Sequence, residues 1–514
     1  MIDQATRIDN RDVPRHWRYS ALADTEWNDA DEASCWDQIS PGHYHGSMKD
    51  TDANRDSVTD HTVEIPTGIG LSLINEVLIL AWPALAQQGL LLLIQLYDQF
   101  LTGQFSPAHP AALTTANYLY WFTTSYAVVV TAGATALVAR MIGANNPSEA
   151  SRAAGQAILL ALTFGLLGTL AAMVGLPTMV GWLGLEGDVA AFAVTYLRPL
   201  AGLLPFYMVE TAGIACLVGA GDTRTGLKVL AVVVLVNVPL AGGLSQGLGG
   251  LPNLGFVGIA WGTGLSHLVG MGLVLLTLSR GRFGLQLRWA WLLPESALIR
   301  RLLRISIPAA VDSLSVGLFQ FVFLRMVNDL GSTAASAHGI AIRLEGLGYL
   351  SGAAFAVAAA SLVGRSLGAG RPDLAAKSGW IALLLGTGIM TLMGLIFFLL
   401  ARPMFELFCP LPSQVPVIET GVPVLRLVAF AMPGLAACII LTQALRGAGD
   451  TRMPVVFTWI GFVGVRLPLT YVLTSPAVGL GLYGAWLAMF ADIYIRGALF
   501  AYRFAGGHWK FIRV

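Results

Sequence analysis

The chain has 514 residues, of which 55% are hydrophobic and only 12% are charged. That charged fraction is about half the value for an ordinary soluble domain, so it cannot solvate so much apolar surface. The composition therefore argues against a soluble globular enzyme, and it excludes disorder for most of the chain as well as a collagen-like or disulfide scaffold. The net charge of +1 gives no indication of a nucleic-acid partner.

The net charge conceals two opposite parts of the chain. The segment 1–66 holds 14 Asp/Glu and 6 Lys/Arg, whereas the remainder holds 16 Asp/Glu and 25 Lys/Arg. No basic segment precedes an apolar stretch at the N-terminus, so this part is not a secretory signal peptide. We predict a disordered acidic cytoplasmic tail over residues 1–70, with a true start at Met48 as the alternative.

From residue 71 onward the sequence is a series of twelve long apolar runs. Each is longer than the roughly 20 residues that an α-helix needs to cross a bilayer, and the Gly and Pro inside them are tolerated in membrane helices. The runs lie at 77–101, 112–138, 157–183, 189–217, 227–248, 255–278, 305–327, 334–363, 379–401, 421–445, 453–474 and 480–502. The sequence therefore predicts an all-α polytopic membrane protein with twelve transmembrane helices.

The basic residues between the runs predict the orientation of the chain. The loops after every second run, together with the C-terminal tail, hold 18 Lys/Arg, whereas the other loops hold one, Arg402. Because Lys and Arg are retained on the cytoplasmic side, we expect both termini to be cytoplasmic and the protein to span an inner or plasma membrane.

The chain also contains an internal repeat. Leu-Val-x-Arg-x-x-Gly-Ala-x-x-Pro at 137–147 recurs at 362–372, and Gly-Ala-Gly-Asp-Thr-Arg at 219–224 recurs identically at 447–452. Pro83-Ala84 similarly corresponds to Pro308-Ala309, with the same offset along the chain as the first motif. Six runs separate the copies, so the two halves have the same orientation and should be related by an axis along the membrane normal. We expect each Gly-Asp-Thr to form a helix C-terminus, a tight turn and an N-cap.

Several motifs in this order resemble the MATE family (multidrug and toxic compound extrusion) over about residues 71–505. They are the two repeated motifs, Asn237-Val238-Pro239-Leu240, Gly258-Ile259-Ala260-Trp261-Gly262-Thr263 and Ser336-Ala337-His338. The resemblance implies two six-helix bundles and the export of cationic or amphiphilic compounds, driven by inward flow of H⁺ or Na⁺. The domains expected are the tail 1–70, an N-terminal bundle 71–278, a cytoplasmic linker 279–304 and a C-terminal bundle 305–514.

Asp98 is the leading candidate for the coupling residue. An ionisable side chain inside a membrane helix is costly, and a buried carboxylate can bind and release a proton or Na⁺. Asp98 resembles the acid of the family's first helix, which follows a kink proline, here Pro83, and precedes a glycine, here Gly103. A carboxylate that extends from the helix end to the membrane surface is the alternative.

Asn237 and Thr263 match the family's polar partners of that acid. Both supply oxygens suited to a hard cation or to a hydrogen bond with a carboxylate, and packing hydrogen bonds between helices are the alternative. Some family members carry a second Asp one helical turn after the Asn, where this chain has Ala241. This departure weakens the case for a Na⁺ site and favours proton coupling.

The C-terminal half departs further from the family pattern. Other members carry a Glu and an Asp where this chain has Val316 and, approximately, Leu435. Asp312 lies one turn before Val316 on the same helix face and could substitute. Glu345 could contact a cationic substrate, or pair with Arg343 or with a neighbouring helix. Asp492 and Arg496 have the i, i+4 spacing of an ion pair within one helix.

Amide and aromatic side chains are candidates for a cavity that binds hydrophobic cations. Gln87 and Gln95 share one helix face, and Asp98 follows Gln95 by about one turn, so we expect the run 77–101 to line the cavity. The other candidates are Asn117, Tyr118 and Tyr120, for which packing against lipid or core is the alternative.

These observations predict an antiporter, not an enzyme, that exports small organic cations or amphiphiles in exchange for H⁺ or, less favoured, Na⁺. We expect no cofactor and no metal, since there is no Cys-x-x-Cys pair and no phosphate-binding loop. The expected partners are the substrate and the lipid bilayer, with the chain as a monomer and no nucleic acid. The alternatives are a flippase for a lipid-linked precursor, which needs cationic side chains in its cleft, and a polytopic membrane enzyme, which needs clustered His or acids. The sequence does not identify the substrate.

Overall fold

The computed structural model describes residues 67–105, 109, 113, 125–182, 187–512 and 514 of the chain. Within these residues, ten helices are long and apolar enough to cross a membrane, and one bent pair forms a further candidate span. The predicted N-terminal tail lies outside the described residues up to the start of the first helix at Thr67. The protein is a multi-pass, all-α protein of the plasma membrane whose long described helices lie on the predicted apolar runs, whereas the short helix Ala401–Phe408 lies in the loop after the run 379–401.

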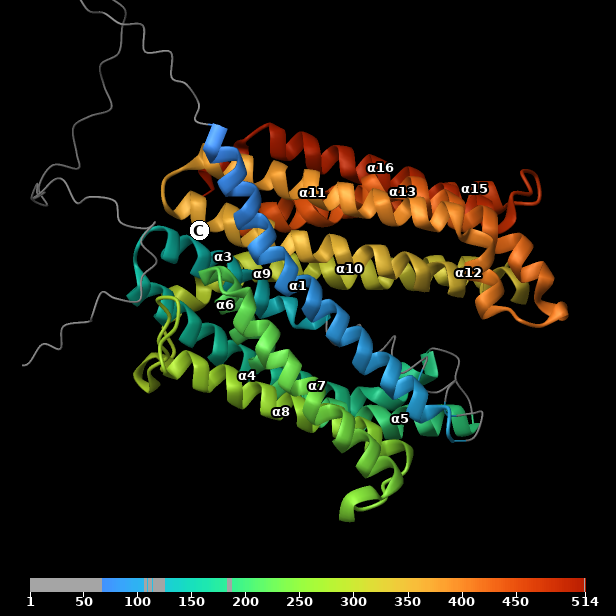
Figure 1. Cartoon of the computed structure of the whole chain (residues 1–514), viewed down its shortest axis with the longest axis horizontal. Coiled ribbons are helices and arrows are strands. Elements are labelled where there is room, and N and C mark those ends of the chain that lie inside the picture. The colour runs from blue at the N-terminus through green and yellow to red at the C-terminus, as the bar shows by residue number, and fades with distance from the viewer. Residues whose placement is uncertain (1–66, 106–108, 110–112, 114–124, 183–186, 513) are drawn as a thin grey trace, which may run out of the picture. The chain divides into compact units, whose positions relative to one another are not determined.

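The helices of each half follow the repeat. In the N-terminal half they are α1 (Thr67–Thr102), α3 (Val128–Gly143), α4 (Pro147–Trp182), α5 (Gly187–Gly202), α6 (Leu204–Ala220), α7 (Thr223–Gln246) and α8 (Phe256–Ser279). In the C-terminal half they are α9 (Ser296–Asn328), α10 (Ser332–Gly368), α11 (Pro372–Leu399), α12 (Ala401–Phe408), α13 (Val415–Gly447), α14 (Arg452–Trp459), α15 (Leu467–Thr474) and α16 (Gly481–Ala505). Figure 1 shows α4, α7 and α8 grouped together, as are α10, α11, α13 and α16.

Two of the apolar runs are not the uniform helices that the sequence predicts. The run 189–217 is divided into α5 and α6, which are bent by 54° relative to each other. The bend falls at Leu203, two residues before Pro205, whose ring removes a backbone donor and disfavours a continuous helix. The run 453–474 contains a π-helical segment, Ile460–Arg466, between α14 and α15. A π-helical segment turns side chains relative to the regular α-helical positions.

Helix α1 contacts both halves of the molecule. It packs against α7 and α8 of its own half and against α10 and α11 of the other (Figure 1). Before Pro83, the buried residues Val77 and Leu80 belong to the apolar core of the C-terminal half; after it, Ile94 belongs to that of the N-terminal half. Pro83 therefore separates the two packing environments of one continuous helix.

The apolar core is organised differently in the two halves. Among the described residues, one extended core cluster lies mainly in the C-terminal half, and two lie mainly in the N-terminal half. On α1, Ile94 belongs to one N-terminal cluster and Leu101 to the other. The same division separates Val233 from Ala241 on α7. The segments between the two clusters carry the polar residues that make up the candidate site.

The repeated Arg-x-x-Gly motifs meet at the interface between the halves. Gly143 lies against the backbone carbonyl of Arg365, and Gly368 lies against that of Arg140, so closely that a Cβ at either glycine would overlap the carbonyl. The Arg140 guanidinium also donates to the backbone oxygen of Ala448, 3.1 Å away. These reciprocal contacts hold the ends of α3 and α10 together.

The two Gly-Asp-Thr-Arg copies form the same predicted turn, with Gly221 and Gly449 both in the left-handed conformation, but they differ at the N-cap. Gly221 ends α6 in the left-handed conformation, and Asp222 caps α7 by accepting a hydrogen bond from the Thr225 backbone N–H at 2.9 Å, as predicted. In the second copy Thr451, not Asp450, is the N-cap of α14. Asp450 instead accepts a hydrogen bond from Arg503, which lies in the last turn of α16. The identical sequence therefore folds into the predicted cap in one copy only.

Candidate ion-coupling site

Asp98, Thr263 and Asn237 are brought together from three helices. The Thr263 hydroxyl donates to Asp98 Oδ2 at 3.2 Å and accepts a hydrogen bond from the Asn237 side-chain amide at 3.1 Å. All three side chains are buried, Asn237 completely. The structure thus joins the acid of α1 to the two partners on α7 and α8 that the sequence indicated.

This arrangement leaves two buried oxygen atoms without a partner among the described residues. They are Asp98 Oδ1 and Asn237 Oδ1. A buried carboxylate or amide oxygen that lacks a hydrogen bond is costly, so it favours uptake of a proton or a cation. Asp98 also forms none of the ion pairs found in the described residues. The site can therefore bind positive charge without displacing a Lys or Arg.

A second buried pair lies beside this site, and the sequence did not indicate it. His267 Nδ1 lies 2.8 Å from Glu210 Oε2, and both side chains are buried. His267 follows Thr263 by one helical turn on α8 and interacts electrostatically with Asp98. Together Asp98, Asn237, Thr263, Glu210 and His267 form what we call the polar layer. The sequence could have marked both residues as candidates, because Glu210 and His267 are ionisable residues inside apolar runs.

The acids of the C-terminal half have arginine partners. Arg446 donates to Asp312 Oδ2 at 2.6 Å, and both side chains are buried. The sequence interpretation counted Arg446 as a loop residue after the run 421–445; this was wrong, because α13 continues to Gly447 and buries Arg446 in its last turn. The negative charge of Asp312 is therefore already compensated.

Asp492 is held by two arginines. Its carboxylate lies 2.7 Å from Arg496 Nε, which confirms the predicted ion pair within α16. Its other oxygen lies 2.6 Å from Arg466 Nη2, on the π-helical segment, and the Asp492 side chain is completely buried. Gly461 leaves room for this contact, because a Cβ there would overlap the Asp492 carboxylate. The π segment thus places Arg466 and Gly461 around one buried acid.

Glu345 lies half-buried on α10 and is attracted by the Arg466 charge. This places it at the edge of the cluster formed by Asp492 and its arginines. Arg343, the alternative partner suggested by the sequence, is exposed.

The other candidates lie on α1 or outside the described residues. Gln87 is half-buried and donates to the backbone oxygen of Thr223 on α7 at 3.1 Å, whereas Gln95 is exposed. Gln87 therefore anchors α1 to the N-terminal half. Asn117, Tyr118 and Tyr120 lie outside the described residues.

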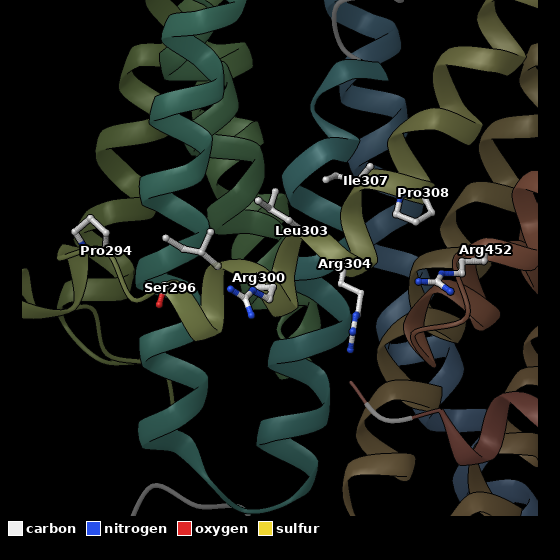
Figure 2. A pocket seen from close by; sticks show the side chains of 9 residues that line it. Pro294, Ser296, Arg300, Leu303, Arg304, Ile307, Pro308 and Arg452 are labelled. Atoms are coloured by element: carbon white, nitrogen blue, oxygen red, sulfur yellow. The ribbon is translucent and has the colours of Figure 1, made fainter.

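Figure 2 shows a cavity of about 650 Å³ at the linker end of α9. Arg300, Arg304 and Arg452 line it together with apolar side chains of α9. Three guanidinium groups repel a cation, so this cavity does not suit a cationic substrate. It also includes none of the residues of the polar layer.

Within the described residues, no three His, Cys, Asp or Glu side chains are grouped so that they could hold a metal ion. The oxygens around Asp98 come from one carboxylate, one amide and one hydroxyl. This set is small for Na⁺, which needs several oxygens, and sufficient for a proton.

Two repeated groups of membrane helices, with a buried and uncompensated acid in one of them, define a membrane transporter. The MatE family model matches residues 83–241 and 308–472, and the chain belongs to the MATE family. It is 30% identical to the probable multidrug resistance protein NorM of Thermotoga maritima, over 85% of this chain and 93% of the relative.

Solved structures show the same fold. The chain resembles the MATE transporter VcmN of Vibrio cholerae with a TM-score of 0.78 and 20% identity, over 87% of this chain and all of that one. It resembles a MOP superfamily transporter from Pyrococcus furiosus with a TM-score of 0.78 and 19% identity, over 85% and 98% of the two chains. These neighbours support the predicted two-bundle architecture.

Proposed function

We propose that this protein is an antiporter that exports organic cations or amphiphiles in exchange for protons. The observation that carries the proposal is the environment of Asp98. It is a buried carboxylate with one unpartnered oxygen and no arginine partner among the described residues, next to a hydroxyl and an amide on two other helices. The multidrug resistance proteins among the relatives support the choice of organic substrates.

Competition between a proton and the substrate for one negative charge couples their movements. Protonation of Asp98 from outside neutralises its charge and weakens the hydrogen bond that it accepts from Thr263. Helix α1 then bends at Pro83. The substrate cavity that we expect α1 to line shrinks, and the cation leaves. Release of the proton toward the cytoplasm restores the charge and allows the next cation to bind.

The position of Pro83 supports α1 as the moving element. The segment before it packs with the C-terminal half, whereas the segment after it carries Asp98 in the N-terminal half. A proline inside a helix removes one backbone hydrogen bond, so bending at this point costs little. A change of charge at Asp98 can therefore alter the packing between the halves.

The oxygen set around Asp98 favours H⁺ over Na⁺. Ala241 stands where some family members have a second Asp, and it supplies no side-chain oxygen. A Na⁺ ion at Asp98 would have only the amide oxygen of Asn237 and the hydroxyl of Thr263 as further side-chain ligands from the polar partners.

The proposal includes the organisation of the chain in the membrane. We assign residues 1–70 to a cytoplasmic tail, 71–278 and 305–514 to the two bundles, and 279–304 to a cytoplasmic linker. Both termini then lie in the cytoplasm, and the chain functions as a monomer. In this orientation the reciprocal contacts, of Gly143 with the Arg365 carbonyl and of Gly368 with the Arg140 carbonyl, lie on the cytoplasmic side and close it.

Ethidium efflux from proteoliposomes tests the proposal. The full chain is reconstituted, ethidium is enclosed, and either a pH gradient or a Na⁺ gradient is imposed. We expect the pH gradient alone to drive export, and we expect Asp98→Asn to reduce it to the rate of protein-free vesicles. Export that requires Na⁺ would replace the proton assignment, and absence of export under both gradients would contradict the antiporter.

A further inference from the structure

We propose that Glu210 and His267 form a second proton-binding site of the N-terminal half, which titrates together with Asp98 when an organic cation binds. The inference rests on the proposed function and deepens it. It gives the polar layer two exchangeable protons, one on Asp98 and one on the imidazole–carboxylate pair.

The pair is built by the close approach of α6 and α8. His267 Nδ1 and Glu210 Oε2 are 2.8 Å apart, and the exposed fractions of the two residues are 5% and 2%. The ring of Tyr207 packs edge-on against the His267 ring with the centroids 5.1 Å apart. The position of the imidazole is thus fixed by two side chains of α6.

Gly270 makes room for the Glu210 carboxylate. A Cβ at this glycine would lie 2.7 Å from both carboxylate oxygens, so any larger residue would displace them. Gly270 lies one turn beyond His267 on the same face of α8. The carboxylate is therefore held between the imidazole and the helix backbone.

The charges around His267 are few. Glu210 and Tyr207 face it from α6, and Asp98 interacts with it electrostatically from α1. The ionisable residues of α7, Arg224 and Lys228, lie in its first two turns, away from the level of Asn237. Helix α5 brings Asp188, Tyr196 and Arg198, and Tyr196 stacks on Phe256 at the opposite end of α8. The imidazole therefore contacts one carboxylate, that of Glu210, and interacts with the second, that of Asp98, only through its charge.

The charge balance explains why a cation would release two protons. With a proton on Asp98 and another on His267, the charges of Asp98, Glu210 and His267 sum to zero. Loss of both protons leaves Asp98 and Glu210 ionised and His267 neutral, a sum of two negative charges. Because repulsion between buried carboxylates is strong, the doubly deprotonated state requires a cation to stabilise it. The two sites titrate as a coupled pair.

The number of protons released can be read from the pH dependence of ethidium binding. The affinity of the full chain for ethidium, measured by fluorescence anisotropy in lipid nanodiscs, should increase with pH. The slope of log affinity against pH equals the number of protons released. We expect a maximal slope of about two for the native protein and about one for either Asp98→Asn or His267→Asn.

Gly270→Ala tests the pair without removing an ionisable group. The added methyl displaces the Glu210 carboxylate, so we expect the slope to fall to about one. Gly272→Ala is the matched control, because a Cβ at Gly272 meets no atom within 4 Å, and it should keep the native slope.

The outcomes separate this inference from the proposed function. A native slope that never exceeds one overturns the inference, whether or not the variants bind ethidium. A slope near two that persists in both His267→Asn and Gly270→Ala overturns it too, because the second proton then binds elsewhere. Ethidium binding that does not depend on pH, or no binding by the native protein, contradicts the proposed function itself.

Discussion

The buried acids of the two halves of the molecule have different kinds of partner. In the spanning helices of the N-terminal half, Asp98 and Glu210 are surrounded by a hydroxyl, an amide and an imidazole. In the C-terminal half, Asp312 and Asp492 are both in contact with arginine. An arginine remains charged at any physiological pH, so it fixes the charge of its partner, whereas an imidazole or hydroxyl does not. This difference supports our proposal that ion coupling takes place in the N-terminal half and that Asp312 and Asp492 stabilise the C-terminal half.

The internal repeat sharpens the contrast. With the offset that relates Pro83 to Pro308, Phe323 is the repeat equivalent of Asp98, and Asp312 is the repeat equivalent of Gln87. Phe323 is completely buried in the continuous core of the C-terminal half. The two halves share a sequence repeat, and they differ at the position of the proposed coupling acid.

Removal of Asp492 should produce the largest effect on stability. Asp492→Ala leaves Arg466 and Arg496 buried without their carboxylate, and loss of one partner of a buried ion pair costs about 3–5 kcal/mol. We expect a correspondingly large decrease in the free energy of unfolding, measured by denaturant titration in detergent. Asp373→Ala is the control, because the Asp373 side chain is 93% exposed. Equal stability of the two variants would show that the ion pairs of Asp492 do not stabilise the fold.

A methyl group at the interface between the halves should have an intermediate effect. Gly143→Ala places a Cβ on the Arg365 carbonyl, and overpacking of this kind costs about 1–3 kcal/mol. We expect the ends of α3 and α10 to separate, which thiol labelling of a reporter cysteine at Ala139, a completely buried position that faces Gly364 of α10, would detect as faster modification. Gly388→Ala, with open space around its Cβ, should label at the rate of the reporter alone. Unchanged labelling in Gly143→Ala would show that this contact does not hold the halves together.

Loss of the hydroxyl between Asp98 and Asn237 should have the smallest effect. Thr263→Val keeps the shape of the side chain but removes two hydrogen bonds, and one such bond between membrane helices is worth about 1 kcal/mol. We expect ethidium efflux driven by a pH gradient to decrease by roughly three- to tenfold, and Thr263→Ser to restore most of it. A valine variant with the native rate would exclude Thr263 from the coupling site.

Length and hydropathy identify most spans without any tertiary information, and the apolar run 77–101 placed Asp98 inside a helix. The group of Asp98, Asn237 and Thr263 was predicted from the resemblance to the MATE family. The pairing of Glu210 with His267 could not be predicted from spacing, because the two residues lie on different helices whose approach depends on Gly270. The pairing of Asp312 with Arg446 was missed for a different reason: α13 extends past its apolar run and takes the arginine into the membrane-spanning body.

The bend between α5 and α6 shows a further limit. The chain is apolar on both sides of Leu203, so an apolar run does not reveal whether it forms one helix or two. Pro205 signals a possible break, but Pro83, Pro239 and Pro308 lie inside continuous helices. Whether a proline breaks a membrane helix depends on whether neighbouring helices satisfy the freed backbone groups.

The most direct measurement compares the acids of the two halves in one assay. Proteoliposomes carrying Asp98→Asn, or the double variant Asp312→Asn/Arg446→Gln that removes both partners of the buried pair, are given the same pH gradient. Ethidium efflux and proton uptake are recorded together. We predict that Asp98→Asn abolishes both fluxes, whereas the double variant retains the native ratio of protons to ethidium even where its stability is reduced. Coupled efflux in Asp98→Asn, or its loss in the folded double variant, would contradict the assignment of coupling to the N-terminal half.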